Sequence, residues 1–169
     1  MRDRRLFNGL TVAAVVAFAS CSDDDLGPEV ENFTAILAKA PIGTPDTNSS
    51  TATGAAVISV VGGTLLYRIE VSGITDVTFA HIHGPAAPGA NAGVIVNLCG
   101  TTQNGNPTSP PCAPGTVNGV LAAGVAALTP TASMSFDRLL TLLRTDSAYV
   151  NVHTTTHPGG EIRGQVVKQ

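Results

Sequence analysis

Short hydrophobic stretches alternate with groups of Gly, Pro, Asn and Ser from Asn32 to the C-terminus. This spacing is typical of an all-β sandwich or barrel rather than of alternating strands and helices. Gly62-Gly63 separates two such stretches and predicts a two-residue hairpin turn. The predicted strands are Phe33–Ala40, Ala52–Val61, Thr64–Val71, Asp76–His83, Gly93–Cys99, Thr116–Ala126, Ala132–Phe136, Tyr149–Thr154 and Glu161–Val167.

One segment departs from this strand pattern. Residues Ser135 to Asp146 place Phe136, Leu139, Leu140 and Leu143 at helical spacing. Ser135 is a suitable N-cap, because its hydroxyl can accept a hydrogen bond from a free backbone N–H of the first turn. We therefore expect one short amphipathic helix that covers an end of the sheets.

The N-terminus has the pattern of an export signal. A basic start is followed by an apolar stretch and small residues before Cys21, so residues 1–20 are expected to be a signal peptide. Residues 18–21, Phe-Ala-Ser-Cys, resemble the lipobox of bacterial lipoproteins, which implies a lipid on Cys21. The alternative is an ordinary signal peptide cleaved nearby. Residues 21–31 include an acidic run and are expected to form a flexible tether. The expected location is the cell envelope, with the lipid anchor as the only membrane contact.

Composition and charge exclude several classes of function. Aromatic residues make up 4% of the 169 residues and Trp is absent, which argues against a platform for stacking nucleobases. From Asn32 onward six basic residues balance six acidic ones. A neutral domain binds phosphate backbones poorly, so no nucleic-acid partner is expected. The order of a Ser-His-Asp triad, a Gly-rich phosphate loop and paired CxxC motifs are all missing, which leaves hydrolase and nucleotide-binding functions without support.

Cys99 and Cys112 flank a loop of Gly, Asn, Thr, Ser and Pro residues. In an exported protein they are expected to form a disulfide, which would stabilise the fold by roughly 3 kcal/mol through the unfolded state. The alternative is two free thiols or soft metal ligands.

All four histidines fall into two short stretches, His81 and His83 in one and His153 and His157 in the other. Side chains at i and i+2 of a strand share a face, so His81 and His83 can offer two imidazoles to one ion. A site of four histidines favours copper or zinc. His157 can join only if the turn that carries it folds back. Two alternatives stay open: an inward-facing structural polar cluster, and a surface that contacts a partner directly.

Polar residues near the second pair of histidines complete the candidate site. Asn151 is a possible hydrogen-bond partner of an imidazole. Glu161 could orient an imidazole and could pair with Arg163. The same network is consistent with a purely structural role.

The stretches Phe79–Ala86, Tyr149–Thr154 and His157–Gln165 resemble those of the CHRD domain, first described in chordin and found in many bacterial exported proteins. The resemblance covers about Asn32 to Lys168, so residues 32–169 are expected to form one CHRD domain. In animal members these domains belong to a protein that binds secreted growth factors. The resemblance therefore implies a binding or structural module whose partner is an unknown envelope or extracellular protein, and not an enzyme.

The CHRD domain in turn is distantly similar to copper/zinc superoxide dismutase. That similarity implies a Greek-key antiparallel β-sandwich, copper ligands at His81, His83 and His153, and an active-site role for Arg163. The loop between Val94 and Gly119 contains no histidine, which excludes a site with two metal ions. The alternative function is therefore a dismutase-like protein with one copper ion, for which His157 could complete the ligand set.

Overall fold

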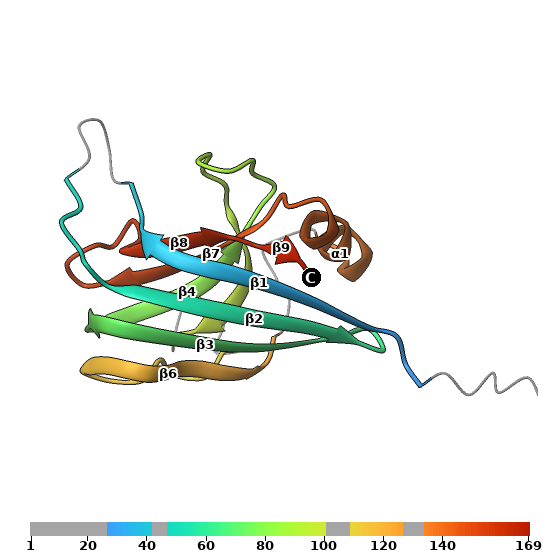
Figure 1. Cartoon of the computed structure of the whole chain (residues 1–169), viewed down its shortest axis with the longest axis horizontal. Coiled ribbons are helices and arrows are strands. Elements are labelled where there is room, and N and C mark those ends of the chain that lie inside the picture. The colour runs from blue at the N-terminus through green and yellow to red at the C-terminus, as the bar shows by residue number, and fades with distance from the viewer. Residues whose placement is uncertain (1–26, 42–46, 101–108, 127–133) are drawn as a thin grey trace, which may run out of the picture.

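The structure is a computed structural model that describes residues 27–41, 47–100, 109–126 and 134–169. The expected signal peptide and Cys21 lie outside these residues. The elements are β1 (Val30–Lys39), β2 (Thr53–Val61), β3 (Thr64–Thr75), β4 (Val77–His83), β5 (Val94–Cys99), β6 (Thr116–Val125), α1 (Phe136–Arg144), β7 (Tyr149–Thr154), β8 (Ile162–Gln165) and β9 (Val167–Lys168) (Figure 1).

The strands form two antiparallel layers that share β1. Strands β1, β2, β3 and β6 lie side by side in one layer, and β8, β7, β4 and β5 in the other. Most of β1 pairs with β2, while its last residues, Ala38 and Lys39, pair with β8. The chain crosses to the second layer after β3 and returns after β5 to place β6 beside β3, which is a Greek-key connection. The predicted all-β, Greek-key-like sandwich is confirmed.

Alternating burial explains why these segments form strands. In β1 the side chains of Phe33, Ala35 and Leu37 point into the core, and the residues between them are mostly exposed. The core fills the space between the layers with aliphatic residues from both. β1 begins at Val30, two residues before the expected start of the domain, and Glu31 is already buried.

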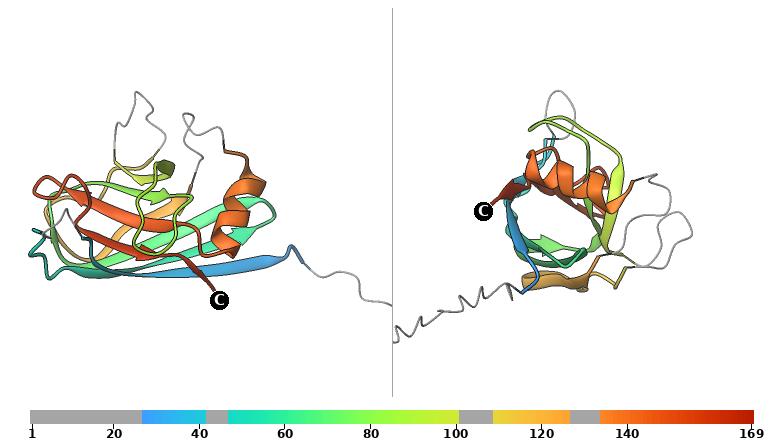
Figure 2. Two further views of the ribbon diagram at one scale, coloured as in Figure 1. Left: turned by 90° about the horizontal axis from the view of Figure 1, so that it is seen from above. Right: turned by 90° about the vertical axis from the view of Figure 1, so that its right-hand side faces the viewer.

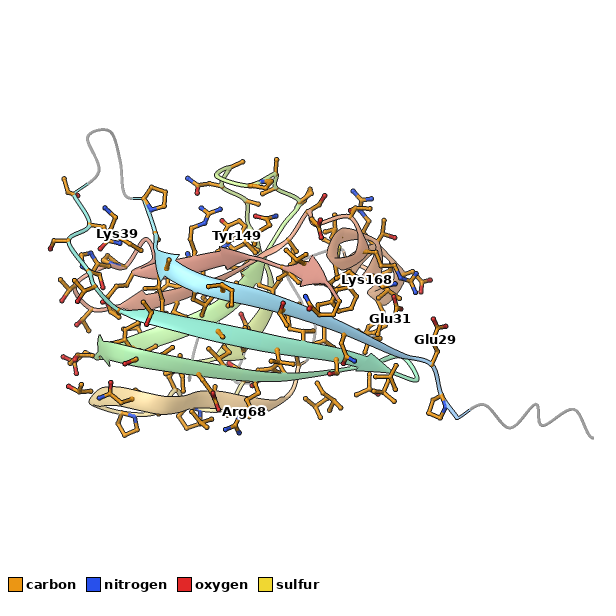
Figure 3. The ribbon with its side chains drawn as sticks, viewed as in Figure 1. Glu29, Glu31, Lys39, Arg68, Tyr149 and Lys168 are labelled. Carbon is orange, nitrogen blue, oxygen red and sulfur yellow. A yellow bond between two sulfur atoms is a disulfide. The ribbon has the colours of Figure 1, made fainter. Side chains whose placement is uncertain are left out.

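Helix α1 lies across one end of the sandwich, as predicted (Figure 2). Ser135 is its N-cap and accepts a hydrogen bond from the backbone N–H of Arg138 at 3.2 Å. At the other end of the helix, Arg144 pairs with Glu31 of β1, which also accepts from Lys168 of β9 at 2.9 Å (Figure 3). This ion cluster fastens the helix to the edge of the first layer.

Two strand predictions differ from the structure. The expected strand Ala132–Phe136 is wrong where it is described, because Met134 and Ser135 are irregular and Phe136 begins α1. The expected last strand is divided into β8 and β9. The division falls at Val166, whose side chain is buried in the core and whose N–H donates to the carbonyl of Ala148.

The predicted disulfide is confirmed. Cys99 at the end of β5 bonds to Cys112, with the two Cα atoms 4.9 Å apart. Beside it, the Tyr67 hydroxyl of β3 donates a hydrogen bond to the carbonyl of Leu98. The hydrogen bond joins the end of β5 to β3 of the opposite layer, and the disulfide joins it to the segment before β6.

Candidate metal centre

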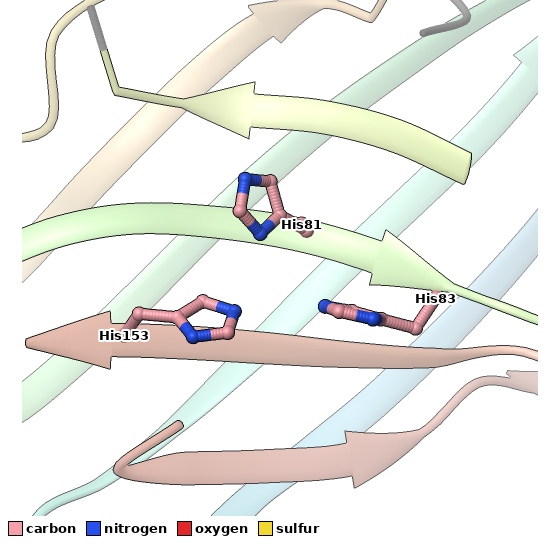
Figure 4. Close-up of side chains that lie close together, drawn as sticks. All are labelled: His81, His83 and His153. Atoms are coloured by element: carbon pink, nitrogen blue, oxygen red, sulfur yellow. The ribbon is translucent and has the colours of Figure 1, made fainter. Parts of the chain in front are cut away.

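His81 and His83 on β4 and His153 on β7 converge on the outer face of the second layer (Figure 4). The opposite face of the same strands carries Ala80, Ile82 and Val150 and belongs to the core. Strand alternation thus directs the imidazoles to the face opposite the aliphatic core. These three residues are called the histidine cluster below.

The histidine cluster is nevertheless buried, with 1%, 7% and 9% of His81, His83 and His153 exposed. Two loops lie near this outer face, and each is held there by a side-chain hydrogen bond. The β4–β5 loop is held by a hydrogen bond from Gln165 Nε2 to the carbonyl of Ala86 at 3.0 Å. The turn between β7 and β8 is held by one from Asn151 Nδ2 to the carbonyl of Gly159 at 3.2 Å. The histidine cluster therefore lies between strands β4 and β7 on one side and the loops that follow these two strands on the other.

The ring nitrogens of the cluster are close enough to share one ion. One ligand nitrogen from each histidine lies within 4.8 Å of the other two. The ring centroids are 5.0 Å apart for His81 and His153, 5.7 Å for His83 and His153, and 5.6 Å for His81 and His83. Because zinc ligands lie about 2 Å from the ion, the three rings would have to move closer together around a bound ion.

Backbone carbonyls fix the orientation of two of the rings. His83 Nδ1 lies 2.9 Å from the carbonyl oxygen of Ala92, and His153 Nδ1 lies 2.9 Å from that of Pro158. A carbonyl oxygen can only accept, so each Nδ1 carries the proton and each Nε2 keeps a free lone pair. Metal-binding histidines characteristically have this arrangement.

The environment also keeps the cluster uncharged. Burial lowers the pKa of His81 to about 3, assisted by the charges that His153 and His83 would carry. Burial lowers the pKa of His83 to about 4, against the hydrogen bond to Ala92 and with help from His153 and Arg163. Burial likewise lowers the pKa of His153, against its bond to Pro158. At neutral pH all three rings are neutral, the form that binds metal.

Buried polar atoms without a hydrogen-bond partner gather in this one region of the described chain. They are both ring nitrogens of His81, Nε2 of His83 and His153, and Oδ1 of Asn97 and Asn151. Asn97 and Asn151 are the cross-strand partners of His81 on its two sides. Apart from the one N–H of His81, every atom in this set offers a lone pair. A cation or a water molecule is the partner that such a set lacks.

The family of the chain follows from a comparison with family models. The model of the CHRD domain matches residues 33–166. This chain belongs to the CHRD domain family. The match confirms the resemblance drawn from the histidine-containing stretches, and it spans the whole histidine cluster. Comparisons with curated proteins and with solved structures found no match. The similarity to superoxide dismutase stays a prediction.

The fourth histidine of this CHRD domain does not join the cluster. His157 lies in the turn after β7, and its backbone closes that turn: its N–H donates to Thr154 Oγ1, and its carbonyl accepts from the N–H groups of Thr154 and Gly160. The group of ligating side chains that the structure brings together contains His81, His83 and His153 without it.

Glu161 and Arg163 also differ from the expectation. Among the hydrogen bonds and ion pairs of the described residues, none joins the Glu161 carboxylate to an imidazole or to Arg163. Its carboxylate accepts from the hydroxyls of Ser50 at 2.7 Å and Thr154 at 2.6 Å. This places Glu161 beside β7 as a partner of hydroxyl groups. The expected Glu161–Arg163 pair is wrong.

Arg163 instead holds the β4–β5 loop over the cluster. Its guanidinium donates to Asn91 Oδ1 at 2.9 Å and to the carbonyl of Ala90 at 2.8 Å. Its guanidinium carbon lies 3.8 Å from the centre of the Tyr149 ring, which stacks on His83 at 4.9 Å with 8° between the planes. Arg163 is thus separated from the cluster by one aromatic ring.

A pocket of about 300 Å³ leads from solvent to this region of the CHRD domain. Its lining includes Arg163, Asn91, Tyr149, His83 and Asn151. Of the histidine cluster, His83 lines this pocket. Within the described residues, no helix is long and apolar enough to cross a membrane.

Sequence reasoning missed Tyr149 and Asn97 as parts of the site. The strand pattern could have identified Tyr149, because alternate residues of a strand share a face and Tyr149 precedes Asn151 and His153 at this spacing. Asn97 was marked by a single signal, a polar residue inside the apolar stretch Val94–Cys99. The carbonyls of Ala92 and Pro158 gave no signal, because any residue has one.

Proposed function

We propose that this CHRD domain is an exported, lipid-anchored module of the cell envelope that binds a transition metal ion, copper or zinc, through His81, His83 and His153. The observation that carries the proposal is the convergence of three neutral, buried imidazoles whose ligand nitrogens have no hydrogen-bond partner. Two of the rings are oriented by carbonyls, as metal ligands usually are.

The two other interpretations of the histidines have less support. A structural polar cluster would pair its donors with acceptors, because an unpaired buried polar group costs about 1–3 kcal/mol. Four ring nitrogens of the cluster are unpaired. A surface for direct contact with a partner would be exposed, yet none of the three side chains is more than 9% exposed.

Export and anchoring rest on the N-terminal sequence. The Cys99–Cys112 disulfide supports export, because such bonds persist mainly in oxidising compartments. A lipid on Cys21 would hold the module at the membrane surface, on the periplasmic or cell-surface side. Its partner would be an envelope or extracellular protein.

The metal content of the full chain tests the metal site. Protein purified in detergent is dialysed against copper or zinc, freed of excess metal and analysed by mass spectrometry for metal and protein. We expect one ion per chain. His81→Ala and His153→Ala should lose it, and His157→Ala should keep it as the matched control. Substoichiometric metal in the folded wild type would refute the site.

A second measurement tests the anchor separately. Mass spectrometry of the mature N-terminus should find Cys21 as the first residue with a lipid attached, and Cys21→Ser should release the protein from the membrane fraction. An unmodified Cys21 in membrane-derived protein would overturn the anchor and leave the metal site in place.

A further inference from the structure

The outer face of the first layer, formed by β1, β2, β3 and β6, is uncovered and largely apolar. It is turned toward the viewer in Figure 1, and no described helix or strand lies in front of it. The exposed large hydrophobic side chains of the described residues all lie on this face, each between 40% and 74% exposed: Val30, Ile36, Val57, Leu66, Val120, Val125 and Val167. Apolar surface gathered in this way usually marks an interaction site. This surface is called the open face below.

The open face carries one charge of each sign. Among the outward-facing residues of its four strands, Arg68 and Glu70 of β3 are the charged ones. Arg68 Nε donates to Glu70 Oε1 at 2.9 Å, and the two side chains remain 53% and 55% exposed. A face without net charge does not attract a strongly acidic or basic partner. It fits a partner that carries the same two charges in reverse order.

A second copy of this chain is such a partner. Two rows of cross-strand neighbours run over β2, β3 and β6 on the open face, Val57–Arg68–Ala123 in the first row and Ala55–Glu70–Val120 in the second. In a symmetric dimer the same surface meets itself about a two-fold axis. An axis between two stacked open faces, perpendicular to β3 and midway between the rows, lays the first row of each copy over the second row of the other. Arg68 of each copy then faces Glu70 of the other.

The apolar positions of the two rows also match about this axis. On β2, Val57 of one copy faces Ala55 of the other. On β6, Val120 of one copy faces Ala123 of the other. Each larger side chain thus meets a smaller one, and inner faces of β-sandwiches interdigitate in the same manner. The open face is therefore complementary to itself in both size and charge.

From this self-complementarity we infer that the open face is the interface of a symmetric homodimer, in which the first layers of two CHRD domains stack face to face. The inference does not depend on the proposed metal site, because the histidine cluster lies on the outer face of the other layer. Both copies keep that second outer face directed away from the interface.

Sedimentation equilibrium of the full chain, in detergent matched to the density of the solvent, tests for the dimer. We expect a monomer–dimer equilibrium with a dissociation constant of about 100 µM or smaller. A chain that stays monomeric at about 100 µM protein would overturn the inference and would leave the open face to a different protein or to lipid.

Charge exchange tests whether this face and this axis are used. Arg68→Glu and Glu70→Arg each place like charges opposite one another, so each variant alone should dimerise at least about tenfold more weakly than wild type. An equimolar mixture of the two variants should form a heterodimer, because every facing pair is then of opposite charge. The double variant Arg68→Glu/Glu70→Arg should dimerise like wild type for the same reason.

Arg138→Glu, an equal change of charge on the exposed side of α1, is the matched control and should leave dimerisation unchanged. Circular dichroism verifies the fold of each variant, and Arg68→Glu should keep the metal content of wild type. Undiminished dimerisation of folded Arg68→Glu, or a mixture of the two variants that stays monomeric, would overturn the interface while leaving the proposed function in place.

Discussion

Acidification from pH 8 to pH 5 should destabilise the metal-free domain. In the folded chain, burial lowers the pKa of His81 to about 3 and that of His83 to about 4, from an ordinary value of 6.5. Below pH 6.5 the unfolded chain therefore binds protons that the folded chain does not. Stability depends on this difference in bound protons, so the free energy of unfolding falls as the pH falls.

The size of the effect follows from the pKa values. One pKa unit corresponds to about 1.4 kcal/mol, so at pH 5 each of these two histidines lowers the free energy of unfolding by about 2 kcal/mol relative to pH 8. His153, whose pKa is also lowered, adds to the loss in the same direction. A total of about 4 kcal/mol or more is a large part of the roughly 5–15 kcal/mol that stabilises a typical domain.

Urea denaturation followed by far-ultraviolet circular dichroism measures this loss. The full chain is kept metal-free with a chelator, and unfolding curves are recorded at pH 8, 7, 6 and 5. His81→Gln removes one buried imidazole and should reduce the decline between pH 8 and pH 5 by about 2 kcal/mol. The reasoning fails if the wild-type free energy of unfolding falls by less than about 1 kcal/mol over this range.

Three further predictions concern the scaffold. Glu31→Gln should lower the free energy of unfolding at pH 7 by about 1 kcal/mol, because both cationic partners of Glu31 are half exposed and solvent screens each ion pair. Hydrogen bonds from Arg144 and Lys168 lower the pKa of Glu31 to about 2, so the difference from wild type in urea denaturation should be full above pH 4.5 and shrink toward pH 2. Replacing Cys99 and Cys112 by Ser should cost about 3 kcal/mol in the same assay, and the wild type in reductant should match the double variant. Gly164→Ala should lower the melting temperature, with a cost of about 2 kcal/mol or more, because a Cβ there would lie 2.0 Å from the carbonyl oxygen of Ile36; a melting temperature equal to that of wild type would mean that β8 does not pass β1 this closely.

Local chemistry explains which parts of the fold were predictable. The hairpin around Gly62-Gly63 joins β2 and β3 at the expected residues, because its turn is specified by the two glycines themselves. The helix also lies at the expected place. Leu139 and Leu143 are buried and Leu140 packs against the core, while Leu142 is a further buried leucine that the pattern did not predict. The error at Met134 to Phe136 arose because a short apolar stretch before a helix resembles a strand.

The candidate site was predictable only in part. Because side chains alternate between the two faces of a strand, the sequence correctly placed His81 and His83 of β4 on one face. It also placed His153 on a strand, β7, and the structure brings that histidine close to the other two. Whether a residue of the following turn joins the site depends on how that turn folds, which the sequence does not specify. His157 was therefore expected as a possible ligand and lies outside the group. The partners of Glu161 come from distant segments, so its bond to Ser50 had no local signal.

The carbonyls that orient His83 and His153 determine which sequence changes the site can tolerate during evolution. Ala92 and Pro158 act through the course of the main chain, and their side chains take no part in the two bonds. Substitutions of Ala92 and Pro158 themselves should therefore leave both bonds in place as long as the backbone path is kept. Insertions or deletions in the loops that carry them are the changes that would turn the rings and abolish the site, even with every histidine retained.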